Sequence, residues 1–317
     1  MIGTRNVSSA LNAAVLTSGG LLRLARPQQW VKNVVVLAGL VFAALSDRPS
    51  AIADALVALL AFIAASSAVY VTNDLRDMEV DRHHPLKRMR PLATGAVRPI
   101  TAAWFAIGLV VLSLGISLLL TPLLALTVGM YLLMMTGYNR GFKQVPILDV
   151  TVIAFGFVLR AVGGAVAVGV PISPWLLLCA FLLALFLGFG KRRAELIELG
   201  DGATRHRQAL GGYTAPLLDQ LVAITAVSAL VTYAVYTVVS TSVPANDSML
   251  FTVPFVAFAI FRYLFLVYGR GLGGSPEGLL FRDGWLLATV VLWGIAALVI
   301  VQTHGDLSTL VFVGNDS

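Results

Sequence analysis

Apolar residues dominate the chain in runs of roughly 18 or more, and each run is long enough to cross the hydrocarbon core of a bilayer as a helix. Short turns rich in Pro, Asn and Asp separate some of these runs, and longer basic loops separate the others. The pattern predicts about nine membrane-spanning helices and no soluble domain. The expected spans are residues 31–46, 51–72, 99–120, 122–140, 146–169, 173–190, 215–241, 250–268 and 283–302.

The composition agrees with this pattern. Only 12% of the 317 residues are charged and 58% are hydrophobic, whereas roughly a quarter of the residues of a soluble domain are charged. The sequence therefore predicts an all-α, polytopic membrane protein. Cys179, the one cysteine, lies in a predicted span, so we expect neither a disulfide nor a cysteine-bound metal.

Lysine and arginine are distributed unevenly between the two sets of loops. Apart from Arg48 in an opposite loop, and Arg160 and Arg262 within spans, they lie in or beside the N-terminal segment and the longer loops. The positive-inside rule places these loops and the N-terminus in the cytoplasm, and the C-terminus outside. We expect the protein in the plasma (inner) membrane.

An acidic motif, Asn-Asp-Leu-Arg-Asp-Met-Glu-Val-Asp, follows the second predicted span. If the helix continues, Asn73, Asp77 and Asp81 lie at i, i+4 and i+8 on one face, and Asp74 borders that face. Carboxylates so close together repel one another unless a cation lies among them. Hard oxygen ligands suit Mg²⁺, which takes one or two carboxylates together with substrate phosphates. The alternative is a solvated acidic helix end.

The loop after this motif is strongly basic. Arg82, Lys87 and Arg90 lie within it. Guanidinium groups bind phosphate oxygens bidentately and lysine adds a compact charge, so the loop could close over a diphosphate. The alternative is a basic loop that contacts anionic lipid head groups.

Several further candidates share one property: each lies at the cytoplasmic end of a predicted span. Those after the sixth span suit an anion site, with a solvated helix end as the alternative. For the others, the alternatives are interfacial anchors and charges that set the topology. These candidates are Lys32, Asn33, Tyr138, Lys143, Lys191, Arg192, Arg193 and Glu195.

Arg160 lies inside the fifth predicted span, roughly 16 Å along the helix axis from Asp149. Ionisable residues at such depth face the bundle interior or a wet cavity. Either a buried structural pair or a contact with a lipid phosphate would satisfy Arg160. The four histidines show no metal-ligand spacing, so a zinc site is not expected.

The nine spans, the pattern Asn73-Asp74-x-x-Asp77-x-x-x-Asp81 and the stretch Arg90-Pro91-Leu92-x-x-Gly95 resemble the UbiA superfamily of intramembrane prenyltransferases. The resemblance implies one helical bundle around a central cavity open to the cytoplasmic side, with a lateral opening for a lipid tail. It also implies Mg²⁺ bound by the four motif residues, of which Asp74, Asp77 and Asp81 are catalytic. Residues 26–317 would be one catalytic domain, preceded by a cytoplasmic segment, 1–25.

One departure from the family pattern points to a particular branch. Typical members carry a second Asp-x-x-x-Asp motif after the sixth span, where this chain has Lys191-Arg192-Arg193-Ala194-Glu195-Leu196. This stretch is similar to the decaprenyl-phosphate phosphoribosyltransferases of actinobacterial cell-wall arabinan synthesis. The resemblance implies 5-phosphoribosyl 1-diphosphate as donor, polyprenyl phosphate as acceptor and release of diphosphate.

Two other functions stay open at this point. The first is a quinone-pathway prenyltransferase with a polyprenyl diphosphate donor, and the second is a transporter. Charges clustered at the cytoplasmic ends argue against a transporter, whose site usually lies near the membrane midplane. Membrane lipids are expected partners, nucleic acid is not, and a homo-oligomer is compatible with the sequence.

Overall fold

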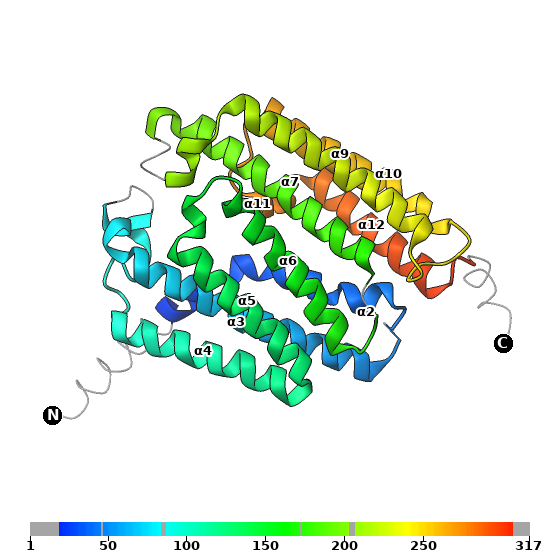
Figure 1. Cartoon of the computed structure of the whole chain (residues 1–317), viewed down its shortest axis with the longest axis horizontal. Coiled ribbons are helices and arrows are strands. Elements are labelled where there is room, and N and C mark those ends of the chain that lie inside the picture. The colour runs from blue at the N-terminus through cyan, green and yellow to red at the C-terminus, as the bar shows by residue number, and fades with distance from the viewer. Residues whose placement is uncertain (1–18, 46, 84–86, 172, 203–206, 307–317) are drawn as a thin grey trace, which may run out of the picture.

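The computed structural model describes residues 19–45, 47–83, 87–171, 173–202 and 207–306. The predicted segment 1–25 falls largely outside these residues, and so does the end of the chain beyond residue 306. The described chain is all-helical, as expected (Figure 1). Its longer elements are η1 (Pro27–Leu37), α2 (Ala38–Phe42), α3 (Pro49–Arg82), α4 (Pro99–Leu120), α5 (Pro122–Arg140), α6 (Leu148–Ala167), α7 (Pro174–Leu199), α9 (Ala215–Val239), α10 (Val253–Leu264), α11 (Pro276–Arg282) and α12 (Gly284–Gln302). Short 3₁₀ or π turns are η2 (Lys87–Met89), η3 (Phe142–Gln144), η4 (Gly200–Gly202), η5 (Gln208–Gly212), η6 (Ser248–Thr252) and η7 (Phe265–Gly269).

The turn residues set where the long helices begin. Proline stands in the first turn of α3, α4, α5 and α7, where its missing N–H costs nothing. Thr121 and Asp283 cap α5 and α12 by accepting hydrogen bonds from the N–H groups of Leu123 and Leu286. The predicted starts of these spans therefore agree with the observed helices within two residues, whereas α3 and α7 continue well beyond the predicted ends at residues 72 and 190.

Within the described residues, seven helical segments are long and apolar enough to cross a membrane: α3, α4, α6, α7, α9, the continuous stretch Ser248–Gly269, and α12. The remaining two predicted spans, residues 31–46 and 122–140, are not among these seven segments. Residues 31–46 are largely covered by the 11-residue 3₁₀ helix η1 and the five-residue α2. Residues 122–140 do form a helix, α5, but Asn139 and Arg140 make its end polar. A count of nine spans stays a prediction.

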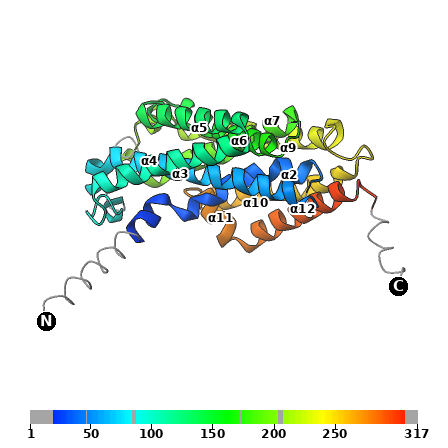
Figure 2. The same ribbon diagram turned by 90° about the horizontal axis from the view of Figure 1, so that it is seen from below.

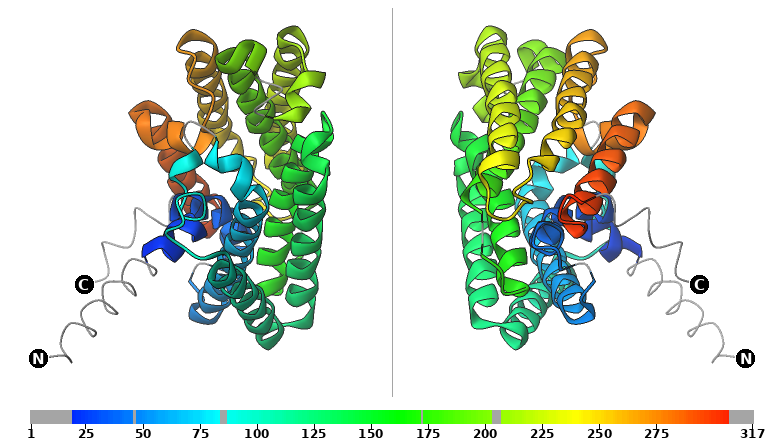
Figure 3. Two further views of the ribbon diagram at one scale, coloured as in Figure 1. Left: turned by 90° about the vertical axis from the view of Figure 1, so that its left-hand side faces the viewer. Right: turned by 90° about the vertical axis from the view of Figure 1, so that its right-hand side faces the viewer.

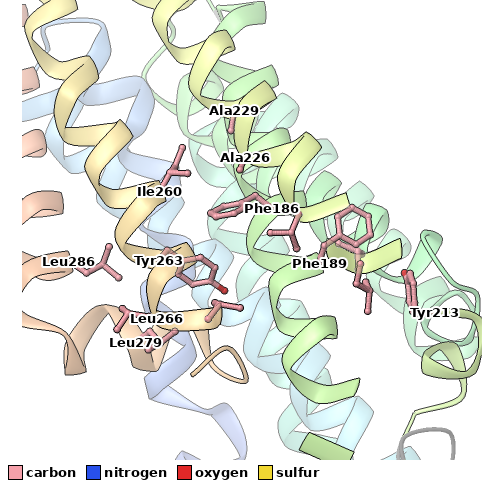
Figure 4. Close-up of a cluster of buried hydrophobic side chains, with 14 of the residues drawn as sticks. Phe186, Phe189, Tyr213, Ala226, Ala229, Ile260, Tyr263, Leu266, Leu279 and Leu286 are labelled. Carbon is pink, nitrogen blue, oxygen red and sulfur yellow. The ribbon is translucent and has the colours of Figure 1, made fainter. Parts of the chain in front are cut away.

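The helices form one bundle in which the first and second halves of the chain lie on opposite sides. Helices α9 and α10 lie across the bundle from α4 (Figure 3). Buried side chains of α3, α5 and α6 form one apolar core. A second core joins α7, α9, α10 and α11 (Figure 4). Helices α6 and α7 connect the two halves.

The first elements cross α6 at backbone contact. A Cβ atom on Gly164 would lie 1.7 Å from the carbonyl oxygen of Val36, and one on Gly39 would lie 2.8 Å from the Cα atom of Ala165. Only glycine permits such an approach. The crossing brings η1 into the bundle, where η1 also contacts α11 (Figure 2).

Candidate active site

The acidic motif occupies the last turns of α3, at the left-hand end of the bundle in Figure 1. Asp74 and Asp81 are each only 3% exposed. One guanidinium nitrogen of Arg90, Nη1, lies 2.9 Å from Asp74 Oδ1 and 2.6 Å from Asp81 Oδ2. Arg26 also donates to Asp74. The loop after the motif thus folds back onto it, and Arg90 pairs with the carboxylates of the motif itself.

The other two motif residues bind a different cation. Lys143 Nζ lies 3.0 Å from Asp77 Oδ2 and 3.2 Å from Asn73 Oδ1. This lysine is in η3, after α5. The Asp77 side chain is 31% exposed, in contrast to 3% for that of Asp74. The motif is therefore divided into an accessible pair, Asn73 and Asp77, and a buried pair, Asp74 and Asp81.

The oxygen donors of the motif fit a Mg²⁺ ion that also binds a diphosphate. No group of three or more Asp, Glu, His or Cys side chains in the described residues is arranged to hold a metal by itself. Mg²⁺ does not need one, because it keeps several waters and takes only one or two carboxylates beside substrate phosphates. Asn73 and Asp77 supply accessible oxygens of this kind. The Lys143 ammonium group already lies within hydrogen-bond distance of both side chains.

A second charged cluster surrounds Asp149, which is fully buried in the first turn of α6. Asp149 accepts hydrogen bonds from Arg192 Nε at 2.8 Å and from Tyr213 Oη at 2.8 Å, and Arg207 Nη2 lies 3.2 Å away. Burial and the Asp149 carboxylate raise the pKa of Tyr213, so its phenol stays protonated and donates. Asp149 is thus paired with Arg192 rather than with Arg160.

The same cluster includes four of the predicted site residues. Arg192, 3% exposed, also donates to Glu195. Lys191 Nζ lies 4.0 Å from Glu195 Oε1, at the limit of an ion pair. Tyr138 accepts a 2.6 Å hydrogen bond from Arg207. Arg192 is therefore tied into the protein, while Lys191 is only loosely held.

Arg160 donates hydrogen bonds to neutral groups deep in the bundle. Its Nε donates to Asn33 Oδ1 at 2.7 Å, its Nη2 to Tyr131 Oη at 2.9 Å and its Nη1 to the Gly156 carbonyl at 2.9 Å. Asn33 is itself fully buried and donates to Ser66. None of the ion pairs found in the described part of the chain includes Arg160.

Lys87 connects the two charged clusters. Burial and the neighbouring Arg90 lower the pKa of Lys87, whereas Asp81, Asp77 and Glu195 act in the opposite direction. Carboxylates of both charged clusters therefore act on the Lys87 ammonium group.

Two predicted site residues lie apart from the rest. Arg82 is 44% exposed at its side chain and pairs with Glu79 on its own helix. Arg193 pairs with Asp219 and its guanidinium stacks on the Tyr268 ring, 3.9 Å from the centroid. Consecutive residues of a helix point about 100° apart, so Arg193 faces away from the Arg192 side.

Glu277 was not predicted from the sequence. It lies in the first turn of α11, and Gln29 Nε2 donates to its Oε1 at 2.8 Å. Lys32 Nζ lies 3.5 Å from the same oxygen. The available signal was its isolation, because Glu277 is the one acidic residue between the eighth and ninth predicted spans.

Comparison with known proteins identifies the family. The model of the UbiA prenyltransferase family matches residues 33–194. The chain belongs to this family. It is also 35% identical over 280 residues to the decaprenyl-phosphate phosphoribosyltransferase of Corynebacterium glutamicum, covering 86% of this chain and 84% of the relative. The enzyme of the same name from Mycobacterium tuberculosis is 36% identical over 279 residues, which cover 86% of this chain and 91% of the relative.

A solved structure supports the UbiA fold. A UbiA homolog from Archaeoglobus fulgidus bound to GPP and Mg²⁺ superposes with a TM-score of 0.70 at 21% identity, covering 88% of this chain and 99% of the other. Together with the seven apolar helical segments, this confirms a multi-pass membrane protein of the UbiA fold.

Proposed function

We propose that this UbiA-family enzyme transfers 5-phosphoribose from 5-phosphoribosyl 1-diphosphate to a polyprenyl phosphate, and specifically to decaprenyl phosphate. The observation that carries the proposal is the 35–36% identity, over 86% of the chain, to two relatives named for this activity. The site supports it, because Lys191 and Arg192 stand at the end of α7, where a second acidic pair is expected for prenyl diphosphate users.

The donor diphosphate would bind at the accessible half of the acidic motif. Asn73 and Asp77 would hold Mg²⁺, which supplies charge neutralisation to the departing diphosphate. Arg90 holds Asp74 and Asp81 in place, so that the end of α3 is preorganised. Lys143 contacts Asp77, and Lys87 interacts electrostatically with Asp81 and Asp77, so both lysines would bind diphosphate oxygens.

The acceptor needs little activation. A phosphate monoester is ionised near neutral pH, so one of its oxygens attacks C1 of the ribose without a strong general base. The new bond joins that oxygen to C1, while the bond from C1 to the diphosphate oxygen breaks and its electron pair leaves with the diphosphate. Lys32 and Lys191 would hold the acceptor phosphate, and the rate enhancement would come from positioning and from charge stabilisation.

The remaining features follow from this assignment. We propose that the enzyme resides in the plasma membrane with the N-terminus and the active site on the cytoplasmic side and the C-terminus outside. The uneven distribution of lysine and arginine supports this orientation. Residues 26–317 would act as one catalytic domain, and the product would serve as a precursor of cell-wall arabinan.

A direct assay tests the proposal. Purified protein receives radiolabelled phosphoribosyl diphosphate and decaprenyl phosphate, with Mg²⁺ or with excess chelator. We expect label in the lipid fraction and stoichiometric release of diphosphate, both lost with chelator. Prenylation of 4-hydroxybenzoate from a polyprenyl diphosphate, with phosphoribosyl diphosphate left untouched, would show instead a quinone-pathway prenyltransferase.

A further inference from the structure

Glu277 is an acidic residue within a group of cations contributed by distant parts of the chain. Its side chain is 13% exposed. It contacts Gln29 and Lys32 of η1, and it also interacts electrostatically with Lys191 of α7. Ser275 caps the N-terminus of α11 by accepting a hydrogen bond from the Gly278 N–H, which holds this turn in place. Residues of η1, α7 and α11 thus bring the Glu277 carboxylate together with Lys32 and Lys191.

The same carboxylate lies within electrostatic range of two tyrosines. Tyr70 is on α3, one turn before Asp74, and its ring stacks with Arg26.

Tyr263 of α10 is 3% exposed, and its hydroxyl has no hydrogen-bond partner in the described residues. Figure 4 shows this hydroxyl directed from α10 toward α7. A Cβ atom on Gly190, the residue before Lys191, would lie 3.1 Å from it. Gln29 and Lys32 closely follow Arg26, which donates to Asp74, so Glu277 lies at the end of the bundle that holds the acidic motif.

A carboxylate in this position is a disadvantage for phosphate binding alone. Each phosphate of the donor and the acceptor would be repelled by it, and burial strengthens that repulsion. A carboxylate accepts about four hydrogen bonds, more than Gln29 and Lys32 supply. A ligand that offsets the repulsion must therefore bring hydrogen-bond donors. Ionised phosphates have none and a prenyl chain has none, whereas a ribose has hydroxyl groups at C2 and C3.

We infer that Glu277 recognises the ribose of the donor by accepting hydrogen bonds from its 2- and 3-hydroxyl groups. Gln29 and Lys32 position the carboxylate, and the residue selects a sugar diphosphate over a prenyl diphosphate. This inference rests on the proposed function and adds a specificity-determining residue to the same site.

The test measures the coupling between this residue and the ribose hydroxyls. The Michaelis constants of phosphoribosyl diphosphate and of its 2-deoxy and 3-deoxy analogues are compared for the wild type, Glu277→Gln and Glu277→Ala. In the wild type, loss of a recognised hydroxyl should raise the Michaelis constant roughly ten- to a hundredfold, as expected for a hydrogen bond to a charged group. In both variants, the constant for the natural donor should rise by a similar factor, and the analogues should lose little more.

A matched control separates recognition from structure and from charge. Glu198→Gln removes the same charge from an exposed residue of α7 and should preserve the discrimination against the analogues. Glu277→Gln keeps the shape of the side chain, so it serves if Glu277→Ala does not fold. If the Glu277 variants discriminate as the wild type does, the residue is only a structural tie between α11 and η1, and the inference is wrong. If the wild type does not use phosphoribosyl diphosphate at all, the proposed function fails as well.

Discussion

Lys143 donates hydrogen bonds to both carboxylate oxygens of Asp77, at 3.1 and 3.0 Å, although 66 residues separate the two in the chain. The ammonium group occupies the accessible side of the acidic motif, where the proposed metal would bind. Under the proposed function, the ammonium group and the metal would compete for this carboxylate until a diphosphate provided Lys143 with a new partner.

Removal of this competitor should strengthen metal binding in the absence of donor. We expect Lys143→Ala to bind Mn²⁺, used as a spectroscopic substitute for Mg²⁺, up to about fivefold more tightly, because partly exposed ion pairs contribute about 0–1 kcal/mol. Turnover should nevertheless fall, since the diphosphate loses a cation. Electron paramagnetic resonance of free and bound Mn²⁺ measures the affinity. Weaker binding would mean that Lys143 does not compete with the metal. Arg140→Ala, which removes another cation near the end of α5, serves as the comparison.

The two halves of the acidic motif should respond differently to the loss of charge. Asp77→Asn should abolish turnover and leave the melting temperature nearly unchanged, because the Asp77 side chain is accessible. Asp74→Asn and Asp81→Asn should also lower the melting temperature by several degrees, because each leaves Arg90 with one carboxylate fewer in a buried network. Thermal unfolding in detergent and an activity assay decide this. Equal melting temperatures for all three variants would contradict the division into a buried and an accessible pair.

Lys191 and Arg193, two residues apart, should differ in their effect on catalysis. Lys191→Ala should raise the Michaelis constant of one substrate, or lower turnover, roughly ten- to a hundredfold. Arg193→Ala should change neither by more than about threefold, because Arg193 is engaged by Asp219 and Tyr268 on another face of α7. Steady-state kinetics with each substrate varied in turn provides the comparison. Similar defects in both variants would place Arg193 in the site after all.

Stability should depend on the charge of Glu277 in a predictable direction. Burial alone raises the pKa of its carboxyl, but Lys32 and Gln29 outweigh burial, so the pKa lies below its usual value. A lowered pKa in the folded state gives stability that is present above the unfolded pKa of about 4.3 and is lost as the pH falls through the folded value. Glu277→Gln should therefore melt below the wild type near neutral pH, and the difference should shrink below about pH 4. A constant difference across this range would contradict the ion pair.

Local periodicity was enough to predict several features of this protein. The lengths of the apolar runs located the long helices, because a helix must be that long to cross a bilayer. The spacing of Asn73, Asp77 and Asp81 predicted one shared helix face, because a helix repeats every 3.6 residues. Asn73 and Asp77 do contact the same lysine, whereas Asp81 shares Arg90 with Asp74. The basic loops and the acidic motif were expected on one side of the membrane, because successive spans run in opposite directions and alternate connections therefore lie on the same side.

Only the tertiary structure decided which charges meet. Asp149 shares a helix with Arg160 but pairs with Arg192 of α7, and Glu277 meets Lys32 from the far end of the chain. These pairings depend on how each helix is rotated and on how closely it packs, for example where Gly164 admits the backbone of Val36. Such contacts join residues that are distant in sequence, so no local pattern encodes them, and the packing of the bundle as a whole selects them.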